Sequence, residues 1–471
     1  MQFPNATSAQ NAFTGCSSLT TFDTTISILE NGRAMFSGCT ALSSFSSSLP
    51  SLVTGDEMFF RCSSLQLLPP SPMDNLLSAV SMFESCSSFQ GSVALQDETP
   101  ASPLFRNSVN ALSDGTSMFA GCEKLLRVET SFPSLVKGDS MFSGCTSLSS
   151  FSASDMSMLS SSHNMFDGCS SLTSCSATLS ETIDDASYMF NGCEKLSSLD
   201  FNQFDVAVGD FALYGCSRLN EFSFPLEHLR SAESMFNSCS SLLEFRVPLP
   251  LLENGKSAFE NCSRLFLFDG GVMNSLKTAT DMFKNCPRLS YVYGGLEQLE
   301  VCDGMFSDCT SLEGFDIPLT SAVNCEEMFK NCTSLVSFTS NLPALQSARM
   351  MFSNCTSLQS FSGGVLSSLE DADDMFNGCA QLLSFSGELP ALKALMGVFN
   401  GCEKLESFTS DLPSLTLGDN AFASCSSLVE FNAPMPALIS GQSMFLDCVK
   451  LNSFTSSLSA LQFGASMFEN C

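Results

Sequence analysis

The chain has 471 residues, of which 49 are Asp or Glu and 20 are Lys or Arg, and its formal net charge is −29. A surface this acidic repels phosphate, so the composition argues against a nucleic-acid partner and favours a soluble, monomeric chain. No apolar run approaches the roughly 18 residues that a membrane-spanning helix needs, so no such helix is expected.

The first residues already belong to a repeating pattern. Phe3-Pro4 precedes Cys16 by the same distance as Leu49-Pro50 precedes Cys62. The residues after Met1 lack the basic region and apolar stretch of a signal peptide. We therefore expect the chain to begin in the middle of a repeat and, because it stops at Cys471, to end in the middle of another, as a fragment of a longer protein would.

One sequence motif, Met-Phe-x-x-Cys-x-x-Leu-x-x-Phe, recurs along the whole chain with minor variations. Its cysteines, which we call the ladder cysteines, are Cys16, Cys39, Cys62, Cys86, Cys122, Cys145, Cys169, Cys193, Cys216, Cys239, Cys262, Cys286, Cys309, Cys332, Cys355, Cys379, Cys402, Cys425, Cys448 and Cys471. They are 23 or 24 residues apart, except for one interval of 36 after Cys86. A fixed period in this range is typical of a stacked solenoid. The long interval predicts an insertion near residues 92–106, either a functional loop or a tolerated one.

The repeat from Cys39 to Cys62 shows which elements to expect. The run Leu42-Ser-Ser-Phe45 predicts a short strand with its apolar side chains inward, which ends before Pro50. Residues 55–59, Gly-Asp-Glu-Met-Phe, predict one turn of helix. The sequence thus predicts an α/β solenoid of about 20 repeats of 23–24 residues, with one short strand and one short helical turn per repeat, as a single domain over residues 1–471.

An acid stands at the start of the predicted helical turn in eight repeats, as Asp56, Asp139, Asp210, Glu233, Asp303, Glu326, Asp373 and Asp419. A carboxylate at this place satisfies free N–H groups and opposes the helix dipole. A row of calcium sites is the alternative, but no D-x-D-x-D-G loop accompanies the acids. We therefore expect a structural role and no metal site.

The chain has 23 cysteines, but their spacing argues against a disulfide framework. In a stack the ladder cysteines form one column at the strand spacing of about 4.8 Å, which predicts a buried ladder of thiols acting as small apolar residues. A zinc site is not expected, because no C-x-x-C pair occurs and His163 and His228 are the only histidines. Cys175, Cys302 and Cys325 fall in other core columns. A redox or disulfide role for Cys302 and Cys325, which lie in adjacent repeats, is the alternative.

The outward strand positions, five and seven after each ladder cysteine, are mostly Ser and Thr. A solvated sheet face explains this pattern, and a binding face is the alternative. One stretch departs from it, with Glu221, Glu244, Arg246, Leu267, Asp269, Tyr291, Tyr293 and Asp316. Because tyrosine is a common interface anchor, the sequence predicts a partner-binding patch made of Glu244, Arg246, Asp269, Tyr291, Tyr293 and Asp316.

The repeats Phe236-Asn-Ser-Cys239-Ser-Ser-Leu242-Leu-Glu-Phe245-Arg-Val-Pro248 and Phe306-Ser-Asp-Cys309-Thr-Ser-Leu312-Glu-Gly-Phe315-Asp-Ile-Pro318 carry a family resemblance. They resemble the BspA-like branch of leucine-rich repeats, whose unit runs Ala-Phe-x-x-Cys-x-x-Leu-x-x-Ile-x-Ile-Pro. The match covers essentially the whole chain, with Phe preferred at the strand core and Leu-Pro frequently replacing Ile-Pro. The resemblance implies a right-handed leucine-rich repeat superhelix in an extended cell-surface or secreted protein that adheres to host proteins or other cells. It implies no catalytic residues.

The leading functional hypothesis is a non-enzymatic scaffold for adhesion or protein binding, with a protein or glycan of a host or other cell surface as its partner. Binding of an ordered surface, glycan or ice, by the Ser/Thr face is the alternative, although ice-type arrays need regular Thr-x-Thr columns and Ser dominates here. No nucleophile–His arrangement occurs, so neither catalytic residues nor a cofactor are predicted. The localisation, at the cell surface or secreted, follows from the resemblance alone.

Overall fold

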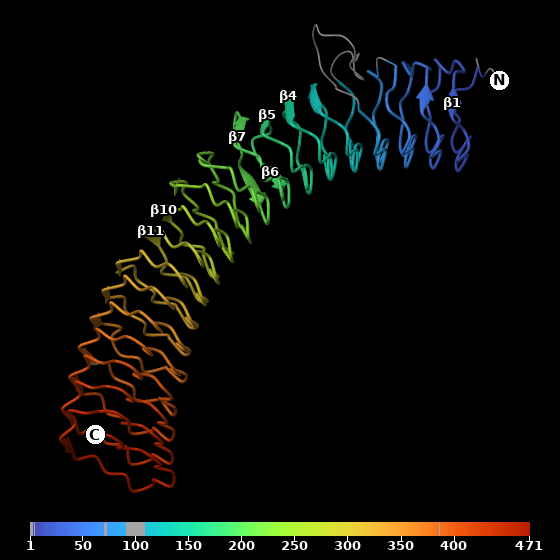
Figure 1. Ribbon diagram of the computed structural model, residues 1–471. Coiled ribbons are helices and arrows are strands. Elements are labelled where there is room, and N and C mark those ends of the chain that lie inside the picture. The colour runs from blue at the N-terminus through green and yellow to red at the C-terminus, as the bar shows by residue number, and fades with distance from the viewer. Residues whose placement is uncertain (1–2, 4, 70–72, 91–108, 386) are drawn as a thin grey trace. The chain divides into compact units, whose positions relative to one another are not determined.

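The computed structural model describes residues 3, 5–69, 73–90, 109–385 and 387–471 (Figure 1). The insertion predicted near residues 92–106 lies outside the described residues. Two compact units make up the chain: Met1–Ser231 with Met235–Ser241, and Ala232–Ser234 with Leu242–Cys471. Both units are built from the same repeat, and a single solenoid over residues 1–471 stays a prediction.

The strands of the first unit are short and pair in parallel. They are β1 (Thr21–Phe22), β2 (Ser44–Phe45), β3 (Arg127–Thr130), β4 (Ser150–Met156), β5 (Ser174–Leu179), β6 (Ile183–Asp185), β7 (Ser198–Phe201) and β8 (Val206–Val208). β1 pairs with β2, and β3, β4, β5 and β7 form one four-stranded sheet in that order. β6 pairs with β8 in a separate two-stranded sheet.

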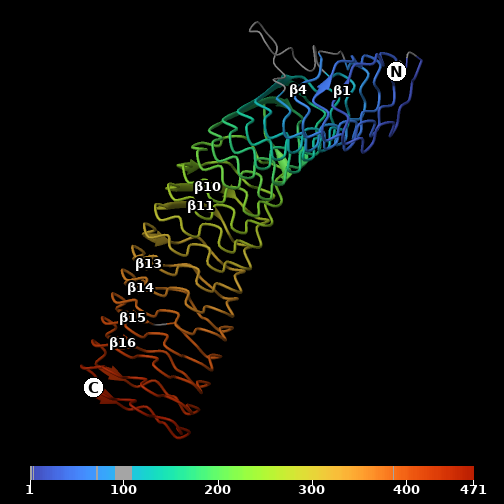
Figure 2. The same cartoon turned by 45° about the vertical axis from the view of Figure 1, so that its right-hand side comes forward.

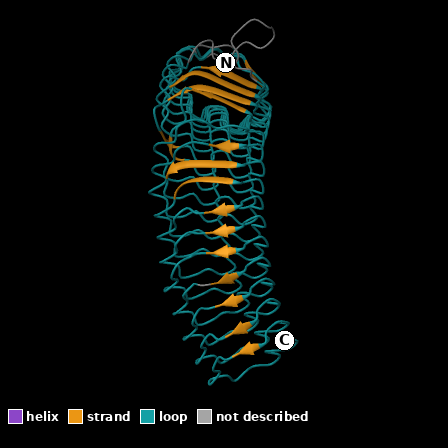
Figure 3. Ribbon diagram, turned by 90° about the vertical axis from the view of Figure 1, so that its left-hand side faces the viewer, coloured by secondary structure: helices purple, strands orange, loops and turns teal. Residues whose placement is uncertain are grey.

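The second unit repeats this arrangement with mostly two-residue strands. They are β9 (Glu244–Phe245), β10 (Leu267–Val272), β11 (Tyr291–Gly295), β12 (Gly314–Phe315), β13 (Ser337–Phe338), β14 (Ser360–Phe361), β15 (Ser384–Phe385), β16 (Ser407–Phe408), β17 (Glu430–Phe431) and β18 (Ser453–Phe454). Figure 2 shows β13 to β16 one after another in chain order. Figure 3 shows the strands as arrows stacked one above another, joined by loops.

The strand register confirms the predicted solenoid. Ser337 pairs with Ser360, and Phe338 pairs with Phe361, so equivalent residues of successive repeats lie side by side. Each repeat therefore contributes one layer, and its core side chains must match those of the layers above and below.

The prediction of a helical turn after each strand is wrong, because the described part of the chain contains no helix. Glu57 and Arg61 have φ angles of 53° and 58°, a left-handed conformation that interrupts a right-handed helix. The N–H groups of Gly55 and Glu57 instead donate to the carbonyls of Ser78 and Val80 in the next repeat, at 2.9 and 2.8 Å. The turn thus bonds to its neighbouring turn, as a strand bonds to its neighbouring strand.

The row of acids has a structural role, but it does not cap helices. Asp56 accepts a hydrogen bond at 2.6 Å from the Ser78 hydroxyl and another at 3.1 Å from the Val80 N–H, both in the next repeat. Asp419 makes the equivalent bonds to Ser440 and Gln442. Among the described residues, no group of three or more His, Cys, Asp or Glu is placed to hold a metal ion.

Two columns of phenylalanine rings fill the core. Phe329, three residues before a ladder cysteine, stacks on Phe352 of the next repeat with ring centroids 5.4 Å apart. Its edge meets the strand residue Phe338, with centroids 5.7 Å apart and planes at 68°. Stacked and edge-to-face aromatic contacts of this kind add about 0.5–1.5 kcal/mol each beyond burial. The same geometry recurs through most of both units.

The ladder cysteines are buried from Cys39 to Cys448, as predicted. Most of these thiols also have a directional role, because they donate to the carbonyl oxygen of the core Phe in the preceding repeat, and Cys239 donates to that of Leu213. The Sγ to oxygen distance is 3.2 Å from Cys62 to Phe36 and 3.0 Å from Cys355 to Phe329. Burial, with a smaller effect of the neighbouring Cys39 thiol, raises the pKa of Cys62 to about 12. These thiols are therefore protonated and unreactive near neutral pH.

The residue seven positions before a ladder cysteine is small in every repeat except that of Leu395, and where it is Gly it leaves room for a methionine of the next repeat. A Cβ on Gly55 would lie 3.0 Å from the Met82 Sδ, and one on Gly32 would lie 2.9 Å from the Met58 Sδ. Cys302 and Cys325 occupy this column and are fully buried, which agrees with their predicted core role.

Native alkylation tests the cysteine assignment. At pH 8, iodoacetamide should modify Cys16 and Cys471, which are exposed, and leave the other 21 of the 23 thiols intact until the chain is denatured. Raising the pH to 9.5 should not label Cys62, because its thiolate forms only near pH 12. Peptide mass spectrometry gives the readout. Rapid native labelling of Cys175, Cys302 or Cys325 would contradict the core assignment.

Candidate binding face

The predicted patch lies largely on one three-stranded sheet of the second unit, in the order β9, β10, β11. Leu267 of β10 pairs with Glu244 on one side and with Tyr291 on the other, and Asp269 pairs with Tyr293. Strand pairing therefore brings five of the six predicted residues onto neighbouring strands, since Arg246 directly follows β9. Asp316 follows β12, which belongs to the next sheet. We call the residues on β9 to β11, with Arg246, the tyrosine face.

The two tyrosines are the most prominent side chains of the tyrosine face. Tyr291 is 54% exposed and Tyr293 is 52% exposed, whereas Leu267 on the adjacent strand is buried between its neighbours. Neither phenol hydroxyl has a hydrogen-bond partner among the described residues. Both rings thus offer apolar area together with an unused polar group.

The charged residues of the tyrosine face are already engaged within the chain. The Arg246 Nε donates to the Glu244 Oε2 at 3.0 Å, and both side chains are about half exposed. Exposed ion pairs of this kind contribute about 0–1 kcal/mol. Asp269 accepts a hydrogen bond from the Gly271 N–H at 3.1 Å, which holds the end of β10.

Two further apolar residues border the tyrosine face, and the strand periodicity did not single them out. Phe266 is 40% exposed and its carbonyl accepts the N–H of Tyr291, while Val272 at the end of β10 is 63% exposed. Phe266 stands four residues after its ladder cysteine, where other repeats have a polar residue, Leu or Val, and none has another aromatic ring. That departure from the column was the signal that could have identified it.

A packing defect lies beneath Tyr293. The inward residue of β11 is Val292, where most repeats have Phe. A small apolar void, too small for a water molecule, is lined there by Phe268, Met273, Phe283, Val292, Tyr293, Gly294, Leu296, Met305 and Ile317. The strand that carries both tyrosines therefore rests on the part of the core where the Phe column is interrupted.

The histidines occupy separate places and neither joins a nucleophile. The His228 Nδ1 lies 2.7 Å from the Asp205 Oδ2, and this hydrogen bond raises the pKa of His228. His163 packs edge-on against Tyr188, with ring centroids 5.8 Å apart. Within the described ranges, no helix has the length and hydropathy that a membrane crossing requires.

A comparison of the sequence with models of known protein families identifies the family of this chain. The model described as the BspA type leucine rich repeat region matches residues 2–92, 105–187, 180–290, 277–388 and 372–471. The chain belongs to the BspA type leucine-rich repeat family. The resemblance seen in the sequence is thereby confirmed. A search among curated proteins finds no match.

Solved structures of other leucine-rich repeat proteins are similar to this BspA type chain. A leucine-rich repeat protein from Bacteroides ovatus is 21% identical, over 96% of this chain and 87% of that one, with a TM-score of 0.45. A leucine-rich cell surface protein from Faecalibacterium prausnitzii is 16% identical, over 69% of this chain and 83% of that one, with a TM-score of 0.31. At these identities the similarity concerns the fold alone.

The void beneath the tyrosine face leads to a stability prediction. Val292→Phe should restore the ring column between Phe268 and Phe315 and stabilise the chain by about 1 kcal/mol through added apolar burial. The measurement is the thermal unfolding midpoint by circular dichroism, with Val292→Ala as the opposite control, which should lower it. A lower midpoint for Val292→Phe would mean that the neighbouring side chains leave no room for the ring.

Proposed function

We propose that this chain is a non-enzymatic scaffold for adhesion and protein binding, present at a cell surface or secreted, and that the tyrosine face is its contact surface. Leucine-rich repeat proteins are generally binding scaffolds, and a stacked solenoid offers an extended face on which many side chains are held in fixed positions. The buried ladder thiols supply no nucleophile near neutral pH, because burial raises their pKa; that of Cys239 reaches about 12.

The exposure of Tyr291 and Tyr293 on one strand is the observation that carries the proposal. Tyrosine has few rotatable bonds, so its ring can bind a partner at a low cost in conformational entropy. The pairing of β11 with β10 holds the backbone beneath both rings, which reduces the ordering cost further. Phe266 and Val272 extend the apolar area around the rings.

The surrounding charges favour a partner of particular chemistry. Arg246 is paired with Glu244, whereas Asp269 forms no ion pair with a described residue. The whole chain has a formal charge of −29. A neutral or basic protein surface with apolar side chains would be attracted to this face, and an acidic one would be repelled.

Binding of an ordered surface by the Ser/Thr face is the second candidate. In the first unit, the Ser176 hydroxyl donates to the Ser152 hydroxyl on the next strand at 3.0 Å, which gives a short regular row of hydroxyls. The row is interrupted on β3, where Arg127 and Glu129 form an ion pair at 3.2 Å. This interruption favours the tyrosine face as the contact surface.

The tyrosine pair gives the direct test of the proposed function. Tyr291→Ser with Tyr293→Ser should abolish binding to the partner, because both rings and their hydroxyls are lost while the fold is kept. Binding would be measured by biolayer interferometry against a panel of purified cell-surface and extracellular proteins. The matched control is Tyr188→Ser with Tyr214→Ser, which removes the other two tyrosines of the chain. Unchanged affinity in the first double variant would refute the tyrosine face as the contact surface.

The second candidate is tested by two measurements on the unmodified chain. If a regular hydroxyl array binds ordered surfaces, the protein should show thermal hysteresis of ice growth or retention on a glycan array. We expect neither effect to depend on Tyr291 and Tyr293. Strong hysteresis that survives their replacement would favour the Ser/Thr face over the tyrosine face.

A further inference from the structure

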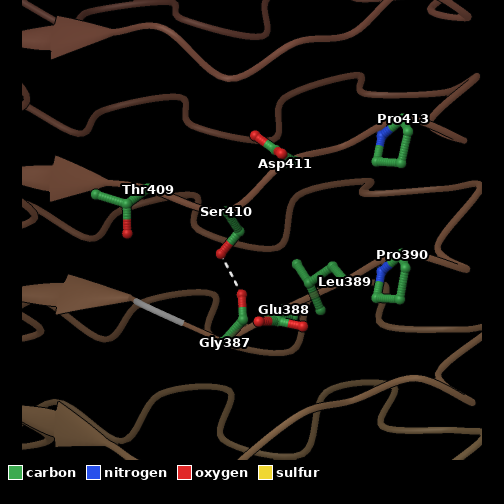
Figure 4. A pocket seen from close by; sticks show the side chains of 8 residues that line it. All are labelled: Gly387, Glu388, Leu389, Pro390, Thr409, Ser410, Asp411 and Pro413. Atoms are coloured by element: carbon green, nitrogen blue, oxygen red, sulfur yellow. Dashed lines mark hydrogen bonds between the residues drawn. The ribbon is translucent and has the colours of Figure 1, made fainter.

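A groove crosses two adjacent repeats of the second unit, just beyond β15 and β16 (Figure 4). Its volume is about 520 Å³, and its lining residues are Gly387, Glu388, Leu389, Pro390, Thr409, Ser410, Asp411 and Pro413. Within the groove, the Ser410 hydroxyl donates to the Gly387 carbonyl and joins the two repeats. A space of this size can hold a long side chain together with part of its backbone.

Two carboxylates, those of Glu388 and Asp411, line this groove. Glu388 and Asp411 lie on neighbouring turns, beside the hydrogen bond between Ser410 and Gly387 (Figure 4). Both are exposed, and neither forms an ion pair with a described residue. Two negative charges on adjacent layers attract a positive group to the space beside them.

The fold itself does not require an acid at this position. Glu388 and Asp411 both stand nine residues after a ladder cysteine and directly before a Leu-Pro pair. Two other repeats with the same Leu-Pro pair have Ser48 and Asn341 there. In the remaining described repeats the position holds Gly, Pro, Asn, Ser or Thr. The two acids are thus a local departure from the column, confined to adjacent repeats that also form a groove.

The walls of the groove determine which cation fits. Leu389, Pro390 and Pro413 provide apolar surface beside the carboxylates, and Thr409 adds a hydroxyl. A bare metal ion would make no use of the apolar wall. An arginine side chain would use both features, because its aliphatic stem can lie on the prolines while its planar guanidinium donates to two carboxylates at once.

We propose that this groove is a binding subsite for an arginine side chain of a protein partner. The subsite is separate from the tyrosine face and does not depend on it. Its carboxylates form charge-assisted hydrogen bonds to the guanidinium. A partner segment would pass across the turns of these two repeats, with its arginine inserted between Glu388 and Asp411.

A peptide pair tests the subsite on the full chain. The probe is a fluorescein-labelled eight-residue peptide of Gly and Ser with one central arginine, and its counterpart carries citrulline, which has the same shape without the charge. Fluorescence anisotropy at about 50 mM salt gives both dissociation constants, since low salt preserves exposed charge interactions. We expect the arginine peptide to bind at least about tenfold more tightly, equivalent to about 1.4 kcal/mol.

Charge-matched variants separate the groove from the general acidity of the chain. Glu388→Gln with Asp411→Asn should remove the preference for arginine over citrulline. The control, Glu313→Gln with Glu370→Gln, removes two exposed acids elsewhere in the same unit and should retain it. Both double variants should unfold at the wild-type temperature, because all four side chains are exposed.

Three outcomes would overturn the proposal: no preference for arginine in the wild-type chain, an equal loss in the control variant, or a preference that survives Glu388→Gln with Asp411→Asn. The variant Tyr291→Ser with Tyr293→Ser should bind the arginine peptide as the wild type does. Failure of the tyrosine face to bind a partner would therefore leave the groove result intact, and the reverse also holds.

Discussion

The hydrogen bonds between successive turns are the constraint on which the rest of the structure depends. Outside the strands, N–H groups such as those of Gly55 and Glu57 donate to carbonyls one repeat later. The ladder thiols add bonds in the other direction, to carbonyls one repeat earlier. Because these bonds fix the rise from one layer to the next, every core column must keep nearly the same side-chain shape. The stacked phenylalanine rings and the methionines seated over small residues satisfy that requirement.

The repeat period and the columns of apolar residues can be recognised in the sequence, and they predict most of the fold. The predicted helical turn was wrong: Glu and Met are good helix formers and Asp suits an N-cap, so these residues favoured a helix locally. The opposing signal lies one residue before each ladder cysteine, where Gly, Asn, Asp or Ser stands in every repeat except that of Arg61. All of these residues adopt positive φ. Such residue types tolerate the left-handed conformation that a helix excludes.

The two candidate sites differ in how much of each could be predicted from the sequence. Alternation along a strand points Tyr291 and Tyr293 outward, and both are exposed. The void beneath them depends on how the neighbours relax around Val292, which no periodicity encodes. The groove beside Glu388 and Asp411 was missed for a related reason. It lies in the loop after the strands, where side-chain direction follows from local backbone geometry and not from a fixed period.

The column of buried thiols also affects how such a chain can mature. An unfolded chain presents 23 free thiols, spaced so regularly that many incorrect disulfides would be about equally easy to form. Once two adjacent repeats have stacked, the thiol between them is buried and its pKa is raised. A buried, protonated thiol is no longer readily oxidised. Protection then spreads with each repeat that joins the stack. In an oxidising compartment, the yield of native protein would be set by a competition between the rate of stacking and the rate of oxidation.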